Sequence, residues 1–328
     1  MKICFLDNVK VPYTSRDIYS NKIRGAENVV LNLSKELSKL NHEVTVYNNC
    51  IGNTKIDNIN WHNIKNINDN PHYDLAISNN DIKLFDKINA IKKVAISHSI
   101  QPIEKFVRKG QLFAYIKHKP KIALLSEYHK INRNYLLRMF GSFKISWGVD
   151  QIFLDASTNN NINNKQAIFT SYTDRNLNLL IEIWKEKIFT KDNNLKLLIT
   201  PLDNDYSQFN IINRKFGDKS NLITDILSSR VFLIPGHKAE LYCIAAEEAR
   251  ELCVPIITLG IGCLKERVEH EKTGFVAKNK DEFADYTFQL FNDEILWNKI
   301  RNNLLLLRGS KKWKSITNQF LKNIYEQN

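Results

Sequence analysis

The stretch Gly236–Gly260, GHKAELYCIAAEEARELCVPIITLG, combines an amphipathic segment with a short apolar run that ends at a glycine. A second apolar run, RVFLIP at residues 230–235, stands directly before it. Two short apolar runs joined by a helical segment are typical of parallel strands connected by a crossover helix. The stretch therefore predicts an α/β fold built around a buried parallel sheet.

Two carboxylates of this stretch, Glu240 and Glu248, are eight residues apart. We expect a helix to begin near Ala239 or Glu240, which places Glu240 beside the helix N-terminus. Eight residues turn a helix by about 800° and advance it by about 12 Å. The two side chains would thus point to the same broad side of the helix but lie too far apart to act as an acid/base pair on one bond. They could instead accept hydrogen bonds from the hydroxyls of one elongated ligand. The alternative is a solvated helix face on which Glu240 favours the helix dipole.

Short apolar runs alternate with amphipathic stretches along the rest of the chain. The first half contains KICFL, HEVTVY, YDLAIS, KKVAIS and KIALLS, and the second half contains QAIFTS and LKLLIT before the two runs described above. A polar, Asn-rich stretch at residues 155–165 separates the halves and suits a linker. We predict two Rossmann-like, doubly wound domains, residues 1–155 and 166–310, that face a central cleft. An amphipathic helix at residues 311–328 could close either domain, for example by packing back on the N-terminal one.

Length and composition favour a two-domain globular protein. The 328 residues are 43% hydrophobic and 25% charged, which is ordinary for such proteins, and the length exceeds that of a typical single domain. No apolar run approaches the roughly 18 residues that cross a bilayer, and the first residues, MKICFLDNVKV, lack the features of a signal peptide. Five widely spaced cysteines favour reduced thiols over disulfides or a zinc site. We expect a cytoplasmic protein.

The net charge of +12 is concentrated in residues 1–150. A basic surface suits nucleic acid, anionic lipid or a phosphorylated substrate, but the sequence has no nucleic-acid-binding signature, so we expect no nucleic-acid partner. Residues 103–121, IEKFVRKGQLFAYIKHKPK, mix aromatic and aliphatic side chains with cations. Such a stretch can bind peripherally to the inner face of an anionic membrane. Alternatively, it is a helix packed by its apolar face with solvated lysines.

Several segments, in the same order, resemble the retaining GT-B glycosyltransferases of family 4. Their signature of a Glu, seven residues, a Glu followed by Ala, and a Pro-Val-Ile-like strand is similar to the stretch with Glu240 and Glu248. Four more segments look like parts of the family. RGAENVVLNLSKELSKLNHEVTVY (24–47) resembles its glycine loop, first helix and second strand, and SHSIQP (97–102) resembles the segment with its active-site histidine. WGVDQIFL (147–154) resembles its Asn-Gly-Val-Asp segment, and GIGCLKERVEHEKTGFVA (260–277) resembles its glycine turn and Thr-Gly-Phe tail.

The resemblance implies a metal-independent, retaining glycosyltransferase of the hexosyltransferase type, as used in glycan biosynthesis. It implies a UDP- or GDP-sugar donor on the C-terminal domain and a sugar, glycan or lipid-linked acceptor on the N-terminal domain. The nucleotide sugar is a substrate, and no separate cofactor is expected. His98 is expected against the transferred sugar, where positive charge develops, and is with Glu240 a predicted catalytic residue.

The resemblance also implies donor-binding roles for single residues. Glu248 is expected to bind the ribose hydroxyls and Glu240 the hydroxyls of the transferred sugar. Arg175 and Gly25 are expected at the diphosphate, and Gly236 is expected in the same donor site. No metal ligand is expected among them.

The chain departs from the family pattern at three places. Arg24 stands before Gly25 where two glycines are usual, Trp147 replaces the Asn of Asn-Gly-Val-Asp, and Arg175 has no obvious second cation upstream. The diphosphate contacts are therefore the least well matched. From the residues alone, Arg175 could also be a surface charge at a helix start, and His98 a core or loop histidine bonded to backbone.

Other interpretations stay open at this point. The segment Asp203-Asn204-Asp205 looks like the Asp-x-Asp metal motif of the other major glycosyltransferase fold, but these residue types in a loop favour a turn. A sugar-nucleotide epimerase or a phosphorylase would fit the same two domains, as would a basic binding module without activity. The sequence contains neither GxGxxG nor a P-loop, so it lacks the fingerprints of NAD and ATP sites.

Overall fold

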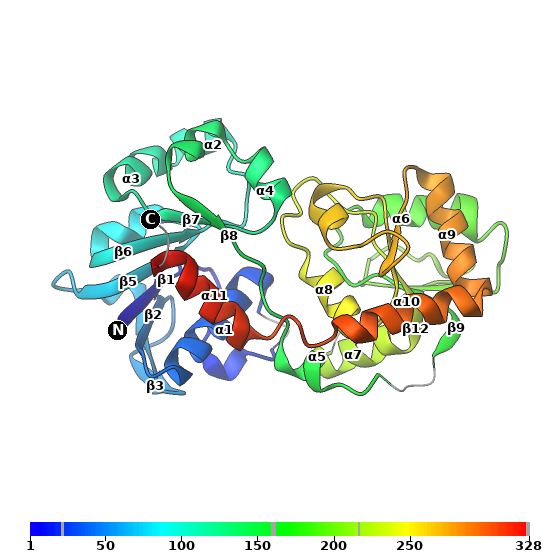
Figure 1. The fold of residues 1–328 in the computed structure, drawn as a ribbon, viewed down its shortest axis with the longest axis horizontal. Coiled ribbons are helices and arrows are strands. Elements are labelled where there is room, and N and C mark those ends of the chain that lie inside the picture. The colour runs from blue at the N-terminus through cyan, green and yellow to red at the C-terminus, as the bar shows by residue number, and fades with distance from the viewer. Residues whose placement is uncertain (21–22, 159–161, 216, 326–328) are drawn as a thin grey trace. The chain divides into compact units, whose positions relative to one another are not determined.

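The structure is a computed structural model that describes residues 1–20, 23–158, 162–215 and 217–325. It contains two compact units, shown as a ribbon in Figure 1. Unit 1 comprises Met1–Gly148 and the segment from Trp313 onward, and unit 2 comprises Val149–Lys312. The chain therefore leaves unit 1 after Gly148 and returns to it at Trp313.

Unit 1 is built on an eight-stranded sheet in the order β3-β4-β2-β1-β5-β6-β7-β8. Neighbouring strands are parallel, except that β3 is antiparallel to β4. Its central strand β1 is fully buried from Ile3 to Leu6, which explains its continuous apolar sequence. The strands are β1 (Lys2–Leu6), β2 (Glu43–Asn48), β3 (Thr54–Ile56), β4 (Ile59–Asn63), β5 (His72–Asn79), β6 (Asn89–Ile96), β7 (Lys121–Leu124) and β8 (Ser142–Lys144).

The last helix of the chain belongs to unit 1 and packs against its first helix. Trp313, at its start, stacks on Trp147 with ring centroids 6.1 Å apart. A Cβ on Gly148 would lie 2.7 Å from the Trp313 ring, so this close approach needs glycine. The helices of unit 1 are α1 (Gly25–Lys39), α2 (Ile103–Arg108), α3 (Gln111–His118), α4 (Glu127–Asn132) and α11 (Trp313–Tyr325).

Unit 2 is built on a six-stranded parallel sheet in the order β11-β10-β9-β12-β13-β14. With unit 1 it confirms the predicted fold class of two Rossmann-like α/β domains. The strands are β9 (Asn163–Ile168), β10 (Lys196–Ile199), β11 (Ile211–Asn213), β12 (Ser229–Leu233), β13 (Ile256–Thr258) and β14 (Gly274–Val276). The helices are α5 (Gln151–Asp155), α6 (Leu177–Ile183), α7 (Lys219–Leu227), α8 (Ile244–Glu251), α9 (Lys280–Asn292) and α10 (Glu294–Leu307).

The passage between the units differs from the predicted linker at residues 155–165. Unit 2 already begins at Val149, so α5 belongs to it. Phe153 of α5 is fully buried, and Arg308 donates to the carbonyl oxygens of Phe153 and Leu154. The Asn-rich stretch lies partly outside the described residues and otherwise within unit 2.

Helix α8 begins at Ile244, so the predicted start near Glu240 was wrong. The segment between β12 and α8 is a loop because Gly236 and Cys243 have φ angles of 93° and 60°, which a right-handed helix cannot contain. Glu240 lies in this loop, ahead of the helix. The helical spacing expected between Glu240 and Glu248 therefore does not apply.

No helix within the described ranges is long and apolar enough to cross a membrane. All five cysteines are buried and free, as expected for reduced core thiols. Burial raises the pKa of the Cys263 thiol to about 12, so this thiol stays protonated.

Candidate functional site

Three loops of unit 2 meet at the carboxyl edge of its sheet. They follow β9, β12 and β13, which are neighbouring parallel strands, and open parallel sheets bind ligands at this edge. Asn176 Nδ2 donates to the carbonyl oxygen of Gly236 over 2.5 Å, which joins the first loop to the second. Cys263 N donates to the carbonyl oxygen of Glu240 over 3.1 Å, which joins the third loop to the second.

Two glycines allow the second and third loops to touch. Gly236 and Gly262 have positive φ angles of 93° and 72°. A Cβ on Gly236 would clash with the carbonyl oxygen of Ile261, and a Cβ on Gly262 would clash with that of His237. Only glycine meets both demands. Gly236 thus has a packing role, and its role in donor binding stays a prediction.

Arg175 in the first loop faces His237 in the second. Its Nη1 lies 3.4 Å from His237 Nδ1, and the N–H of Ala239 also points to Nδ1, over 3.1 Å. A ring nitrogen that faces two donors is an acceptor, so we assign the ring proton to Nε2. His237 was not among the predicted site residues. Its position next to Gly236, at the end of a buried strand, is the signal that could have identified it.

Glu240 has a buried carboxyl oxygen, Oε2, that accepts no hydrogen bond from the described part of the chain. Burial raises the pKa of Glu240, whereas a hydrogen bond with Cys243 and the charge of Arg175 lower it. An unsatisfied buried polar atom costs about 1–3 kcal/mol. A ligand hydroxyl that donates to Oε2 would recover part of that free energy.

Glu248, on α8, has a different set of charged neighbours. Burial raises its pKa to about 8, and the negative charge of Asp150 acts in the same direction. Lys219 and Arg214 act in the opposite direction, although Lys219 is itself bonded to Asp150. The structure thus separates the environments of the two carboxylates: Glu240 lies among the three loops, and Glu248 beside the Asp150–Lys219 pair.

His98 lies at the carboxyl edge of the unit 1 sheet, where only Ser97 separates it from the end of β6 at Ile96. Its Nε2 is 3.0 Å from Asn79 Oδ1, and Asn79 Nδ2 donates to Asp7 Oδ1 over 3.0 Å. The Tyr13 hydroxyl donates to Asp7 Oδ2 over 2.5 Å. Burial lowers the pKa of His98 to about 4, and the nearby His129 contributes in the same direction. The His98 ring is therefore neutral at neutral pH.

Gly25 is the first residue of α1. It is exposed, and a Cβ there would meet no described atom within 4 Å, so packing does not require glycine. Arg24 precedes it as the N-cap residue and makes no side-chain capping bond. The predicted contact of Gly25 with a diphosphate stays a prediction.

The segment Asp203-Asn204-Asp205 contains a local turn, as its residue types predicted. Asp205 Oδ1 accepts from Ser207 N over 2.8 Å, and Oδ2 accepts from Ser207 Oγ over 3.1 Å. These bonds lower the pKa of Asp205. Within the described ranges, no group of three or more His, Cys, Asp or Glu side chains is arranged to hold a metal ion.

The basic stretch at residues 103–121 is not one amphipathic helix but two short ones, α2 and α3, separated by Gly110 with a φ of 67°. Phe106 and Tyr115, two of the aromatic residues of this stretch, are buried in the core with ring centroids 5.3 Å apart. Phe113, in contrast, is 72% exposed. Only part of the stretch is thus available to a partner.

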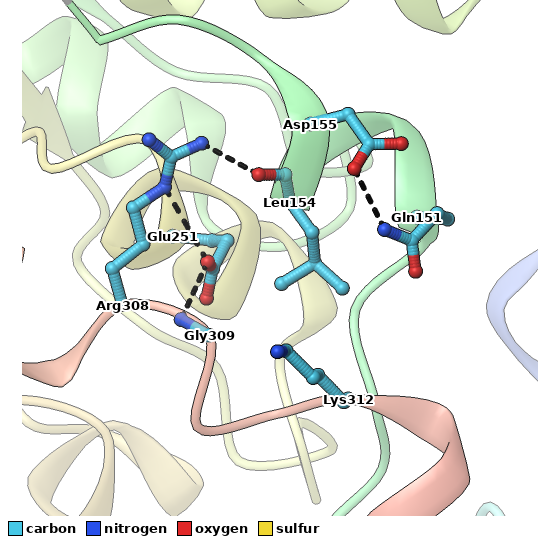
Figure 2. A pocket seen from close by; sticks show the side chains of 7 residues that line it. All are labelled: Gln151, Leu154, Asp155, Glu251, Arg308, Gly309 and Lys312. Carbon is cyan, nitrogen blue, oxygen red and sulfur yellow. Dashed lines mark hydrogen bonds and ion pairs between the residues drawn. The ribbon is translucent and has the colours of Figure 1, made fainter.

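A cavity of about 350 Å³ in unit 2 contains none of the predicted site residues, and its polar groups largely bond to one another (Figure 2). Arg308 Nη2 donates to the carbonyl oxygen of Leu154 over 2.8 Å, and Arg308 Nε lies 3.6 Å from Glu251 Oε1. The same carboxylate oxygen accepts from Gly309 N over 2.8 Å. The cavity is lined by Gln151, Leu154, Asp155, Glu251, Arg308, Gly309 and Lys312.

Residues 176–304 match the family described as glycosyl transferases group 1. The matched segment covers most of unit 2 and includes Gly236, Glu240 and Glu248, but it begins after Arg175. Among curated protein sequences, none matches the chain.

Solved glycosyltransferases share the fold along the whole chain. Sucrose-phosphate synthase from Thermosynechococcus elongatus superimposes with a TM-score of 0.69 at 12% identity over 98% of both chains. Anabaena HepE in complex with UDP and glucose gives 0.73 at 14% identity, and a glycosyltransferase from Rickettsia africae gives 0.69 at 14%, each over 100% of both chains. The chain therefore has the GT-B fold of these proteins.

Proposed function

We propose that the chain transfers a sugar from a UDP- or GDP-sugar donor to a sugar, glycan or lipid-linked acceptor, with retention of configuration and without a metal ion. The observation that carries the proposal is the meeting of Arg175, His237 and Glu240 at one edge of the unit 2 sheet. A guanidinium, a ring N–H and a buried carboxylate with an open acceptor suit a diphosphate and sugar hydroxyls. The match to glycosyl transferases group 1 and the HepE structure with UDP-glucose support this class of ligand.

The chemistry requires the leaving diphosphate to be stabilised as its bond to the sugar breaks. The Arg175 guanidinium can pair with phosphate oxygens, and His237 Nε2–H can donate to them. Glu240 accepts from hydroxyls of the transferred sugar, Glu248 accepts from the ribose, and His98 contacts the transferred sugar. Retention without a protein nucleophile makes an oxygen of the donor phosphate the base for the acceptor hydroxyl.

Donor binding is the first test of this proposal. Thermal unfolding is measured with UDP, GDP and their sugars at millimolar concentration, because a ligand of the native state raises the Tm. Glu240→Gln keeps the side-chain volume and should reduce the shift caused by the nucleotide sugar but not that caused by the bare nucleotide. Glu269→Gln, at an exposed carboxylate of the same unit, is the matched control. A chain that no nucleotide or nucleotide sugar stabilises would contradict the proposal.

Product analysis separates sugar transfer from the other reactions that two such units could perform. With a donor labelled in the sugar, we expect the label on the acceptor, an unchanged anomeric configuration by NMR, and undiminished turnover in EDTA. A changed sugar that is still bound to the nucleotide would indicate an epimerase, and release that requires phosphate would indicate a phosphorylase. Either result would contradict glycosyl transfer.

We further propose that α2 and α3 contact the inner face of an anionic membrane, where a lipid-linked acceptor would lie. Phe113 is 72% exposed, and Val107 and Ile116 are also exposed large hydrophobics. Lys105 and Arg108, on α2, are exposed cations. Apolar side chains beside cations suit the boundary between lipid headgroups and acyl chains.

Co-sedimentation with vesicles tests this contact. We expect the chain to bind vesicles rich in phosphatidylglycerol but not vesicles of phosphatidylcholine, and the binding to weaken with salt. Phe113→Ser should weaken it. Ile295→Ser, at a side chain of unit 2 that is 84% exposed, is the control. Equal binding by Phe113→Ser and the parent chain would contradict the proposal.

A further inference from the structure

A chain of hydrogen bonds in unit 1 connects His98 to three side chains that have been given no role so far. It passes from His98 to Asn79 at the end of β5, then to Asp7 after β1, and then to Tyr13. These three side chains are only 2–3% exposed, and the strands β1, β5 and β6 are neighbours in the sheet. Buried polar groups are costly unless they are hydrogen-bonded, so a satisfied chain of this kind favours one definite arrangement.

The direction of each hydrogen bond follows from Asp7. Its Oδ2 accepts from the Tyr13 hydroxyl and its Oδ1 accepts from Asn79 Nδ2. Burial raises the pKa of Asp7 to about 7. When the carboxyl group is protonated on Oδ2, the oxygen that faces Tyr13, its Oδ1 still accepts from Asn79. Asn79 therefore turns its Oδ1 toward His98. Because an amide oxygen can only accept, His98 Nε2 must carry the ring proton.

The remaining contacts of His98 hold the residue without engaging the other ring nitrogen. Asn80 Oδ1 accepts from the backbone N–H of His98 over 3.0 Å. His129, whose charge affects His98, is buried, and its Nδ1 accepts from Leu125 N over 3.3 Å. Among the described contacts, His98 Nδ1 has no hydrogen-bond partner.

We propose that Asn79, Asp7 and Tyr13 are positioning residues that hold His98 in its Nε2–H tautomer and leave Nδ1 as an acceptor for a hydroxyl of the bound sugar. The tautomer rests on the geometry of unit 1 alone, whereas its catalytic consequence rests on the proposed function. A neutral acceptor nitrogen can bind a hydroxyl without placing a second positive charge beside an oxocarbenium-like transition state. Without the Asn79 oxygen, the ring is free to exchange tautomers.

Long-range ¹H–¹⁵N NMR of the full chain, labelled with ¹⁵N-histidine, measures the tautomer directly. We expect the His98 signals, assigned by their loss in His98→Gln, to show a protonated Nε2 and an unprotonated Nδ1 at neutral pH. A proton on Nδ1 in the parent chain would overturn the proposal. Because this measurement needs no variant of the positioning residues, it stands even where such a variant does not fold.

Variants then test which side chains hold the ring. Asn79→Leu should give averaged signals from both tautomers, and Tyr13→Phe, which keeps the aromatic ring, should move them in the same direction. Asn80→Gly removes only the bond to the backbone N–H and tolerates the φ of 66° at this position, so it should keep the parent tautomer. Unchanged His98 signals in both Asn79→Leu and Tyr13→Phe would overturn the positioning role.

Turnover tests the consequence for catalysis. In Asn79→Leu we expect kcat to fall roughly 10- to 100-fold, by analogy with side chains that orient metal-bound histidines, with unchanged affinity for the nucleotide. The double variant with His98→Ala should lose no more than His98→Ala alone, because both changes remove the same interaction. Independent, additive losses would overturn the coupling. Failure of the proposed function would instead appear as no transfer by the parent chain, while the NMR result still decides the tautomer.

Discussion

The carboxyl group of Glu248 has a pKa raised from 4.5 to about 8, chiefly by burial and then by Asp150. The folded state therefore binds this proton more tightly than the unfolded state. Its contribution to stability is present below about pH 4.5 and is lost as the pH rises toward 8. In Glu248→Gln this loss should disappear, so the variant should gain stability relative to the parent between pH 5 and pH 8, by up to about 1.4 kcal/mol per pKa unit. Urea unfolding at both pH values measures it.

The control for this prediction is Glu269→Gln, which alters an exposed carboxylate of the same unit. It should leave the pH dependence of the free energy of unfolding as it is in the parent. If Glu248→Gln and the parent lost the same free energy between the two pH values, the elevated pKa of Glu248 would be refuted.

His98→Ala separates a catalytic role of this residue from a structural one. Loss of one polar contact made mainly in the transition state costs on the order of 10²-fold in rate, or about 3 kcal/mol. The variant also leaves Asn79 Oδ1 without its partner, which should lower the free energy of unfolding by about 1–3 kcal/mol. The measurement is therefore turnover per folded molecule, beside nucleotide affinity and Tm. Turnover near the parent value in folded variant would refute the catalytic role.

For single residues, the sequence indicates the position on the sheet better than it indicates which side chains contact each other. Asp7 and Asn79 directly follow the apolar runs KICFL and YDLAIS, so the sequence alone could have predicted their position at the carboxyl edge of a sheet. Their contact with His98 depends on β5 lying between β1 and β6. Strand order is a property of the folded sheet, and the local pattern of a strand does not contain it.

Among the helices and strands, features with a local cause were predicted, and a feature with a long-range cause was missed. The runs RVFLIP and VPIITLG predicted β12 and β13 because burial on both faces leaves a local apolar pattern. The start of α8 was missed because the positive φ of Cys243 accompanies a loop held by the Cys263 N–H on the Glu240 carbonyl oxygen. That bond joins residues from two different loops, so no local propensity reports it.

Gly262→Ala tests how strongly these loops depend on each other. The variant would need a Cβ at a φ of 72° and against the carbonyl oxygen of His237, and strain of this kind costs about 1–3 kcal/mol. We expect a lower free energy of unfolding in urea and weaker nucleotide binding. Gly141→Ala, whose Cβ would meet no described atom closer than 3.8 Å, should match the parent. A Gly262→Ala chain as stable as Gly141→Ala would contradict the packing role.

For the whole molecule, alternating strands and helices predicted the two α/β units but not their borders. Border residues are assigned by packing: α5 is held in unit 2 by the burial of Phe153, and α11 is held in unit 1 by the stacking of Trp313 on Trp147. These contacts join segments far apart in the chain. The prediction from composition placed the border in the Asn-rich stretch after α5, which is polar but does not divide the units.

The two ends of unit 2 lie side by side. Val149 pairs with Lys312 in an isolated parallel bridge, and Val149 N donates to the carbonyl oxygen of Lys311 over 2.9 Å. Residues 149–312 expressed alone should therefore unfold in one cooperative step, as calorimetry can measure. A fragment without a cooperative transition would contradict this independence.

Because its two ends are adjacent, unit 2 is an insertion in topological terms: the chain leaves unit 1 after Gly148 and re-enters it at Trp313. A module with its ends together can be exchanged for another, or circularly permuted, without cutting a strand of the host sheet. Recombination at Gly148 and Trp313 would thus replace unit 2 as a whole in a single genetic step and leave the sheet of unit 1 uncut.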